Sequence, residues 1–313
     1  MNTTLEPAAR REIGVDVSKE TLDVFDGSCF WQTPNSPAGV KDLIRRLRKE
    51  AKEHPLRVTC EATGRYGDLL AVECLKAGIP VSIANPRLVR DYAKSGGKLA
   101  KTDRLDARAI AAYSAHHNPP VLDAAWTERQ KFVERYTRMT QLIDKAAHEK
   151  STLDQFHEPK IQAEIRRSIT TLERQIAAYE EELEAMIAAC AELAAKSKAL
   201  RQIKGVGKRT VQAALALMPE LGKVNREQAA ALAGLAPMNR DSGKIKGKRF
   251  IQGGRARFRK VLYMAALSAS RFNPILLEFS GHLKEQGKPT KVRICAVARK
   301  LLVLMNSTLK NLS

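Results

Sequence analysis

Residues 12–32 read EIGVDVSKETLDVFDGSCFWQ, and this stretch decides which fold the sequence predicts. It contains three short β-type runs, Glu12–Val17, Thr21–Phe25 and Ser28–Gln32, which are separated by turn residues. Such runs are typical of a meander of antiparallel strands. The apolar residues of Pro37–Glu53 then follow helical spacing, so we expect a helix to end the meander.

The chain continues with alternating strand and helix patterns. We predict a strand at Arg57–Glu61, a helix near Gly67–Gly78, a strand at Pro80–Ala84 and helical material from Pro86 to His117. Three strands followed by strand, helix, strand and helix is the order expected of an RNase H-like α/β sheet. The pattern alone leaves other α/β folds open.

The middle of the chain has the pattern of a long helix. Beyond Trp126 we predict continuous helix with one break at Glu158-Pro159. Apolar residues then recur in steps of four and three for about five heptads, which predicts a coiled-coil arm about 50 Å long. Whether this arm pairs with another subunit or with residues 126–156 of its own chain is open. The predicted seam consists of Ile165, Ile169, Leu172, Ile176, Tyr179, Leu183, Met186, Cys190, Leu193, Ser197 and Leu200.

The chain of 313 residues has a net charge of +20, and nearly all of the excess lies in its last third. Residues 201–313 contain 23 Lys and Arg against 5 Asp and Glu, whereas residues 1–124 contain 19 against 16. A basic surface of this density attracts a polyanion, so nucleic acid is the leading partner. A membrane-surface role is a distant alternative, because no amphipathic anchor or apolar span accompanies the charge.

Length and composition predict the domain organisation and the compartment. We predict an RNase H-like α/β domain at 1–124, a helical coiled-coil arm at 125–199 and a basic, all-α domain at 200–313. The five widely spaced cysteines form no CxxC pair, so we expect reduced core thiols rather than a disulfide framework or a zinc cluster. The chain starts without an apolar signal stretch, which predicts the cytoplasm.

Four acidic residues are candidates for a metal site. Asp16 interrupts an apolar strand and Glu61 ends the fourth strand, which lies beside the first strand in an RNase H-like sheet. Asp103 and Asp106 are three residues apart on a helix and therefore share a face. Four converging oxygen donors suit one or two Mg²⁺ ions, with Mn²⁺ as the second choice, and such ions support phosphoryl transfer.

Each of these acidic residues also has a structural interpretation when it is taken alone. Asp103 could cap a helix and Asp106 could pair with nearby arginines. The order of all four along the chain weakens that interpretation. Asp23 and Asp26 have no partner motif, and we predict that both lie at the surface.

The basic third begins with LRQIKGVGKRT at 200–210, which predicts two helices joined by a Gly-Val-Gly turn. This pattern is typical of a helix-hairpin-helix, whose turn and second helix offer N–H groups to a phosphate. A simple interhelical turn is the alternative. Residues 238–254 follow as a polar, glycine-rich loop before a basic helix at Arg255–Arg271. The candidates for phosphate contact in the turn are Gly205, Gly207, Lys208 and Arg209.

The sequence resembles the DEDD transposases of the insertion-sequence-110 family, relatives of the Piv-type DNA invertases, over nearly the whole chain. Four blocks in this order carry the resemblance: GVDVSKETLDV at 14–24, CEATGRYG at 60–67, ANPRLVRDYAKSGGKLAKTDRLDARAIA at 84–111 and GLAPMNRDSGKIKGKRFIQGGRARFRKVLYMAA at 234–266.

The resemblance implies a DNA recombinase with a RuvC-like first domain, a coiled-coil middle and a C-terminal transposase domain. It implies that the four acidic residues act with Mg²⁺ and that Ser242, in the SG motif, is the nucleophile that becomes linked to DNA. It also implies a structured guide RNA that pairs with donor and target DNA. A serine hydroxyl needs activation by a base or a metal. Nearby cations could stabilise the phosphate charge: Lys244, Lys246, Lys248, Arg249, Arg255 and Arg257.

The carboxylates and Ser242 lie at opposite ends of the predicted arm. We therefore expect a composite active site, assembled between the subunits of a dimer or tetramer associated with the bacterial nucleoid. A Holliday-junction-type nuclease, in which metal-activated water attacks, is the first alternative. A nucleic-acid-binding protein without catalytic activity is the second.

Overall fold

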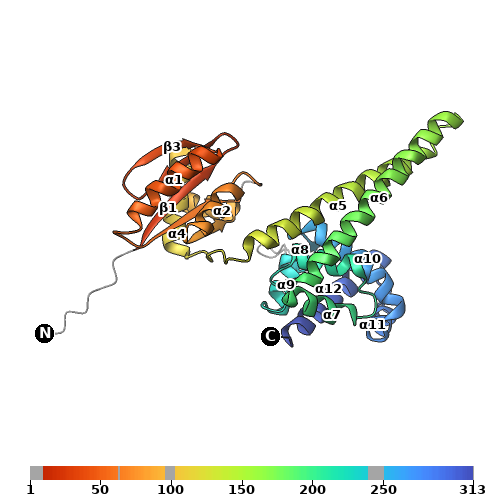
Figure 1. Cartoon of the computed structure of the whole chain (residues 1–313). Helices are drawn as coiled ribbons and strands as arrows, with labels where there is room; N and C mark the ends of the chain where they lie inside the picture. The colour runs from red at the N-terminus through yellow and green to blue at the C-terminus, as the bar shows by residue number, and fades with distance from the viewer. Residues whose placement is uncertain (1–9, 63, 96–102, 239–249, 313) are drawn as a thin grey trace. The chain divides into compact units, whose positions relative to one another are not determined.

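The computed structural model describes residues 10–62, 64–95, 103–238 and 250–312. The chain forms two compact units, Met1–Thr127 and Glu128–Ser313 (Figure 1). The first unit ends close to the first predicted boundary, at residue 124. The further division of the chain into an arm and a basic domain stays a prediction.

The first unit is built on a five-stranded sheet in the order β3-β2-β1-β4-β5. Strands β1, β2 and β3 are antiparallel neighbours, whereas β4 is parallel to both β1 and β5. This mixed arrangement is that of an RNase H-like sheet, which confirms the fold predicted for the first part of the chain. The strands are β1 (Arg11–Val17), β2 (Thr21–Phe25), β3 (Phe30–Pro34), β4 (Leu56–Glu61) and β5 (Val81–Ala84).

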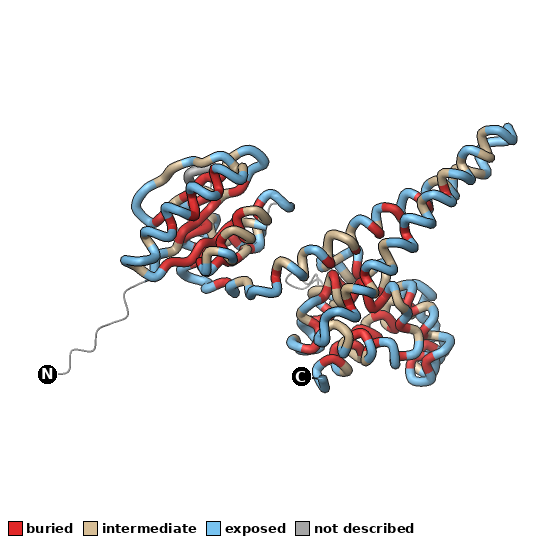
Figure 2. The backbone as a smooth tube through the Cα atoms, viewed as in Figure 1, coloured by how far each residue is buried: buried red, intermediate tan, exposed pale blue. Residues whose placement is uncertain are grey.

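One face of this sheet is apolar and packs against α1 (Pro37–Glu50) and α2 (Asp68–Lys76). Helix α1 starts where the Ser36 side chain accepts a hydrogen bond from the Gly39 N–H group, with Pro37 in its first turn. Its apolar stripe and the apolar strand residues form the core that Figure 2 shows as buried. This core includes Ile13, Val15, Leu22, Val24, Val40, Leu43, Leu47, Val58, Leu70 and Val81.

The opposite face of the sheet is covered by α4 (Asp103–His117), which also packs against α3 (Pro86–Ser95). A small apolar cluster that includes Val89, Ile110 and Tyr113 joins these two helices. Much of the strand surface beneath α4 is polar, which sets this face apart from the apolar one. The candidate carboxylates belong to this polar face.

The second unit begins with a helical hairpin made of α5 (Trp126–Leu153) and α6 (Pro159–Ala189). Ion pairs join Arg135 to Glu182 at 2.9 Å and Lys150 to Glu173 at 2.6 Å, so the two helices run antiparallel. The arm that the sequence left without a partner therefore pairs with its own chain. The finer description of this pair as a coiled coil stays a prediction.

The predicted helix is not continuous along the whole seam. Helix α6 ends at Ala189, and Cys190 is extended, with φ −113° and ψ 113°, before α7 (Ala191–Arg201) begins. Cys190 is also exposed, as is Cys29, so the expectation that all cysteines are core thiols was wrong for these two. The seam thus consists of two helices rather than one.

The rest of the second unit is a helical bundle with a short β-ribbon. The ribbon consists of β6 (Pro237–Met238) and β7 (Phe250–Ile251), and it overlaps residues 238–254, which the sequence predicted to be loop only. None of the helices in the described ranges is both long enough and apolar enough to cross a membrane. The elements are α8 (Lys208–Leu217), α9 (Arg226–Leu232), β6 (Pro237–Met238), β7 (Phe250–Ile251), α10 (Ala256–Phe272), α11 (Pro274–Glu285) and α12 (Thr290–Lys310).

Candidate active site

The ends of β1 and β4 bring two candidate carboxylates to the same place. The register of these parallel strands runs as far as Val15 opposite Cys60, and its continuation by one residue sets Asp16 opposite Glu61. Such paired residues point to the same face of a sheet, and neighbouring strands are about 4.8 Å apart. Both carboxylates are half-buried. The structure thus places Asp16 and Glu61 at one edge of the sheet.

Helix α4 lies on the face of the sheet that carries Asp16. A Cβ atom on Gly14 would come within 2.0 Å of the Ala107 carbonyl oxygen, so strand and helix backbones are in contact there. Further along the helix, the Ser114 hydroxyl donates to Glu12 at 2.6 Å. The helix therefore runs antiparallel to β1, and its first turn approaches the Asp16 end of the strand.

The other two candidates lie in this first turn. Asp103 is the first residue of α4 and stands one helical turn before Ala107; its side chain is outside the described residues. Asp106 is half-buried. Two strand residues span about 6.6 Å and one helical turn about 5.4 Å, so the start of α4 is level with Asp16. The backbone thus brings Asp16 and Glu61, at the ends of β1 and β4, to the same level as Asp103 and Asp106 at the start of α4.

The buried guanidinium of Arg57 fixes the C-terminal end of α4. Arg57 is 1% exposed, and its Nε donates to Glu12 Oε2 at 2.9 Å. Its other nitrogens donate to the Ser114 carbonyl oxygen and to Asn118 Oδ1, each at 2.7 Å. Burial alone would raise the pKa of Glu12, but hydrogen bonds from Ser114 and Arg57 outweigh it and hold the pKa below its ordinary value. This network sets the register of α4 on the sheet.

Two further carboxylates are buried in this unit, although the sequence predicted them at the surface. Asp23 is 4% exposed and Asp26 is 7% exposed. The prediction was wrong for Asp23 because β2 is an inner strand that is covered by α4 on one face. It was wrong for Asp26 because the turn that follows β2 folds around its carboxylate. Burial alone would raise the pKa of Asp26, but the N–H groups of Cys29 and Ser28 donate to its carboxylate and keep the pKa below its ordinary value.

Asp23 is the cross-strand neighbour of Asp16 in the antiparallel register of β1 and β2. Residues paired in this way point to the same face of a sheet. Gln32, the neighbour of Asp23 on β3, donates its Nε2–H to Asp23 Oδ1 at 3.0 Å. Gln32, Asp23, Asp16 and Glu61 thus form one row across the sheet, which we call the acidic row. The short β1–β2 turn, which fixes the register, was the signal that sequence reasoning missed.

The acidic row and the start of α4 offer carboxylate oxygens, which are the ligands that Mg²⁺ and Mn²⁺ prefer. Within the described ranges, no three His, Cys, Asp or Glu side chains form a ready-made metal cluster. The Asp103 side chain lies outside those ranges. The donors fit such a cation in kind, and they come from two strands and one helix.

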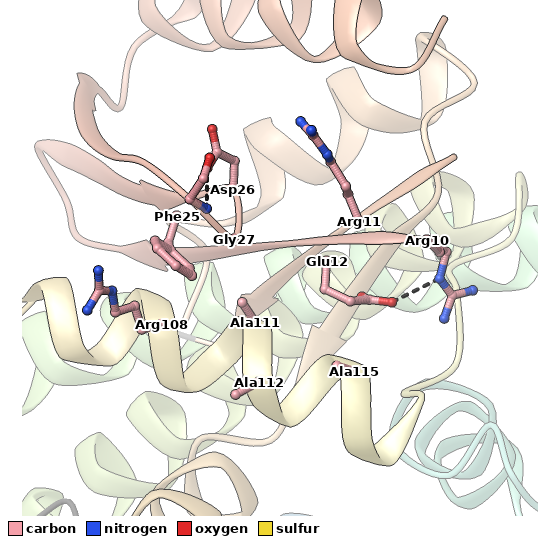
Figure 3. A pocket seen from close by; sticks show the side chains of 11 residues that line it. Arg10, Arg11, Glu12, Phe25, Asp26, Gly27, Arg108, Ala111, Ala112 and Ala115 are labelled. Atoms are coloured by element: carbon pink, nitrogen blue, oxygen red, sulfur yellow. Dashed lines mark hydrogen bonds and ion pairs between the residues drawn. The ribbon is translucent and has the colours of Figure 1, made fainter. Parts of the chain in front are cut away.

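A hollow of about 530 Å³ lies at the other end of β1 from the acidic row. Arg10, Glu12, Phe25 and Arg108 are among the residues that line it. Figure 3 shows that its arginines point in different directions, with Arg10 turned toward Glu12. The guanidinium of Arg108 lies over the Phe25 ring at 4.9 Å. Because these cations do not converge, we assign no ligand to the hollow.

In the sequence, the predicted nucleophile comes after the first strand of the small ribbon and before the second. Strands β6 and β7 pair Pro237 with Ile251 and Met238 with Phe250. The segment between them, 239–249, is outside the described residues. It contains Ser242, Lys244, Lys246, Lys248 and Arg249.

Close backbone contacts build the base of this ribbon. Gly234 has a φ of 68°, and a Cβ atom there would come within 2.2 Å of the Gly253 carbonyl oxygen. A Cβ atom on Gly254 would come equally close to the Gly234 nitrogen, at 2.2 Å. Arg259 Nη1 donates to the Gly253 carbonyl oxygen at 2.7 Å. Close backbone contacts therefore hold together the described residues on either side of the segment that contains Ser242.

The Gly-Val-Gly turn joins α7 to α8. Gly205 has a φ of 99°, and a Cβ atom there would come within 2.5 Å of the Ala269 Cβ, so the position requires glycine. Lys208 Nζ lies 3.8 Å from Glu180 Oε2, and Arg209 also pairs with Glu180. A phosphate at this turn would compete with that carboxylate. The helix-hairpin-helix and its phosphate contacts stay predictions.

Two basic residues predicted to contact nucleic acid, near the start of α10, differ in their surroundings. The Arg255 guanidinium donates to the Glu220 carboxylate at 2.5 and 2.6 Å and to the Leu217 carbonyl oxygen at 2.9 Å. Burial alone would raise the pKa of Glu220, but the hydrogen bond from Arg255 helps to hold the pKa below its ordinary value. Arg257 is exposed. Arg257 is thus the more accessible of the two to a phosphate.

Two family models match the chain. One is described as "Transposase IS116/IS110/IS902 family" and matches residues 197–281. The other, a "Transposase" model of the IS110 DEDD type, matches residues 13–158. The chain belongs to the IS110 family of DEDD transposases. The two matches include the acidic row, the start of α4 and Ser242.

Relatives of this transposase include the pilin gene-inverting proteins of Moraxella bovis and Moraxella lacunata. Each is 28% identical over 95% of this chain and 95% of the relative. Two solved structures of RuvC from Thermus thermophilus, one of them in complex with a Holliday junction substrate, are 18% identical and cover 35% of this chain and 98% of theirs. Their TM-scores of 0.28 and 0.27 are too low to add to the argument from sheet order. The IS110 transposase is a DNA-recombining enzyme.

Proposed function

We propose that this transposase cleaves and exchanges DNA strands with a divalent cation, held by carboxylates, and a serine nucleophile. The cation would be Mg²⁺ or Mn²⁺, and Ser242 would be the nucleophile. The main support is the shared edge of β1 and β4, which lies level with the first turn of α4. Matches to IS110 models in both parts of the chain support joining the two parts in one reaction. The carboxylates are those of Asp16, Glu61, Asp103 and Asp106.

In this mechanism the Ser242 hydroxyl oxygen attacks the phosphorus of one phosphodiester. An Oγ–P bond forms, the bond from phosphorus to the departing sugar oxygen breaks, the serine loses its proton and the departing oxygen gains one. A cation held by the carboxylates would neutralise charge on the phosphate and on the departing oxygen. Attack by a sugar hydroxyl of a second strand on the serine-linked phosphorus releases Ser242 and rejoins the DNA. Cations beside the serine stabilise the phosphate: Lys244, Lys246, Lys248 and Arg249.

The substrates in this proposal are donor and target DNA, and a structured RNA from the element is the guide. The support for polyanionic partners is the charge of residues 201–313, with 23 Lys and Arg against 5 Asp and Glu. The guide RNA follows from the family resemblance. A preparation that carries a discrete RNA, and that recombines a matching DNA pair only with this RNA, would support this part of the proposal.

Trapping of a covalent adduct tests the nucleophile. Labelled DNA, incubated with the full chain, its RNA and Mg²⁺, should give an adduct that survives denaturation and maps to Ser242 by mass spectrometry. Ser242→Ala should abolish the adduct and strand exchange, whereas Ser268→Ala, at an exposed serine of α10, should retain both. Cleavage without any adduct, unchanged in Ser242→Ala, would instead indicate attack by water, as in a Holliday-junction-type nuclease.

Mixed assemblies test whether different subunits supply the carboxylates and the serine. Asp16→Ala and Ser242→Ala chains should each be inactive alone because each lacks one half of the chemistry. When the two are assembled together, a composite site with both halves intact should restore part of the strand exchange. Mixed assemblies that form but recover no activity would contradict a composite site.

A further inference from the structure

The acidic row contains one carboxylate to which the proposed mechanism gives no role. Asp23 is 4% exposed and is the cross-strand neighbour of Asp16. It faces α4, because Phe25, two residues further along β2, lies under the Arg108 guanidinium of that helix. Asp23 therefore lies between the sheet and the helix whose first turn contains the other two candidate ligands.

Two other carboxylates of this unit, on the Glu12 and Asp26 side chains that are 11% and 6% exposed, show how the protein compensates such a charge. Glu12 accepts hydrogen bonds from Arg57, Arg10 and Ser114. Asp26 accepts hydrogen bonds from two backbone N–H groups and a hydroxyl, and it pairs with an arginine. Each of these carboxylates thus has at least one cationic partner and several donors.

Asp23 lacks compensation of this kind. Its hydrogen-bond partner is the neutral amide of Gln32, at 3.0 Å. Among the residues that the structure describes, no lysine or arginine forms an ion pair with it. Burial of a carboxylate without a cation is costly, and like charges directly opposite on neighbouring strands destabilise a sheet. Asp23 therefore adds a negative charge beside Asp16 that a bound cation would balance.

We propose that Asp23 is a positioning residue of the divalent-cation site. Its carboxylate places a further negative charge beside Asp16, which strengthens cation binding, and Gln32 holds that carboxylate in place. This inference rests on the proposed function in one respect, the binding of a divalent cation by the acidic row. It adds a fifth carboxylate to the four that the sequence suggested.

Binding of Mn²⁺ to the full chain, measured by calorimetry without nucleic acid, tests the proposal. Asp23→Asn keeps the shape of the side chain and an oxygen that can accept from Gln32, so it removes mainly the charge. We expect it to weaken Mn²⁺ binding by about tenfold or more, as is typical when a partner of a metal ligand is lost. Asp26→Asn is the matched control and should leave Mn²⁺ affinity unchanged, because Arg46 and the turn beside it already compensate that carboxylate.

Thermal unfolding distinguishes this role from a merely structural one. Without Mn²⁺, Asp23→Asn should unfold at the same or a higher temperature than the natural chain, because it removes a like charge beside Asp16. With Mn²⁺, it should gain less stabilisation than the natural chain. A structural role would give the opposite result, a lower unfolding temperature without the ion and an unchanged response to it.

Asp16→Asn separates failure of this inference from failure of the proposed function. Loss of Mn²⁺ binding in Asp16→Asn together with unchanged binding in Asp23→Asn would overturn the role of Asp23 and leave the cation site in place. Unchanged binding in both variants, or no binding by the natural chain, would overturn both. Loss in Asp16→Asn with weakening in Asp23→Asn is the expected result.

Discussion

The two ends of the interface between β1 and α4 differ in how they balance negative charge. At one end, Glu12 is enclosed by Arg57 and Ser114, so its charge is balanced within the protein. At the other end, about 13 Å away along the strand, Asp16 and Asp23 lie side by side, and Asp23 is bonded to a neutral amide. Helix α4 therefore joins an end where Glu12 is balanced within the protein to the acidic end where we propose that a cation binds.

Removal of the Arg57 guanidinium, which balances the charge of Glu12, should have the largest effect on stability. Arg57→Met leaves Glu12 buried without its main partner, which we expect to lower the free energy of unfolding of the first unit by about 3–5 kcal/mol. Both tryptophans of the chain, Trp31 and Trp126, belong to this unit, so their fluorescence during urea unfolding reports it directly.

Arg45→Met is the control for this experiment. Arg45 pairs with Asp42 on the surface of α1, where both side chains are more than 60% exposed. Its loss should change the free energy of unfolding by at most about 1 kcal/mol. Equal losses in the Arg45 and Arg57 variants would show that the buried network contributes no more than a surface pair.

A change at Gly14, where β1 contacts α4, should reduce both the stability of the first unit and its binding of Mn²⁺. In Gly14→Ala the new methyl group would meet the Ala107 carbonyl oxygen at 2.0 Å, so α4 must move away from β1. We expect a loss of about 1–3 kcal/mol in the free energy of unfolding, together with weaker Mn²⁺ binding. Gly67→Ala, whose methyl group would lie 3.6 Å from Cys60 Sγ, should cost less. Unchanged Mn²⁺ affinity in Gly14→Ala would contradict a role for α4 in the cation site.

The smallest expected effect is the pH-dependent contribution of Asp26 to the free energy of unfolding. The pKa of Asp26 in the folded chain lies below its ordinary value of 3.8, because hydrogen bonds outweigh the effect of burial. A lowered folded pKa stabilises the fold above about pH 4, and this contribution is lost as the pH falls through the folded pKa. Asp26→Asn should thus be less stable than the natural chain by about 1 kcal/mol at pH 7. Urea unfolding should show the difference shrink below pH 4, and a constant difference would count against this account.

Local patterns predicted the first unit well, and they failed where tertiary contacts decide. Strand alternation located the strands, but β3 begins at Phe30 rather than at Ser28, because the Asp26 carboxylate holds the N–H groups of Ser28 and Cys29 in a turn. The heptad spacing continues through Cys190, although the helix does not. Beyond this break, α7 packs against α8 and α12, so a change of partner ends the hairpin where the spacing gives no sign of it.

The candidate site was predictable to the extent that it depends on strand order. Adjacency of the first and fourth strands sufficed to place Asp16 beside Glu61. Asp23 was missed because its motif gave no sign of function, and only the register of two antiparallel strands shows what lies next to it. The role of Ser242 stays a prediction that rests on the family, since its segment is outside the described residues.

The ribbon at the start of α10 has a consequence for how this protein can vary. Pro237 pairs with Ile251 and Met238 with Phe250, so the described residues on either side of 239–249 lie next to each other. Each doubling of a loop adds only about 0.6 kcal/mol of closure entropy. Additional residues inserted between Met238 and Phe250 should therefore cost the fold little stability, while the glycine contacts of Gly234, Gly253 and Gly254 stay as they are.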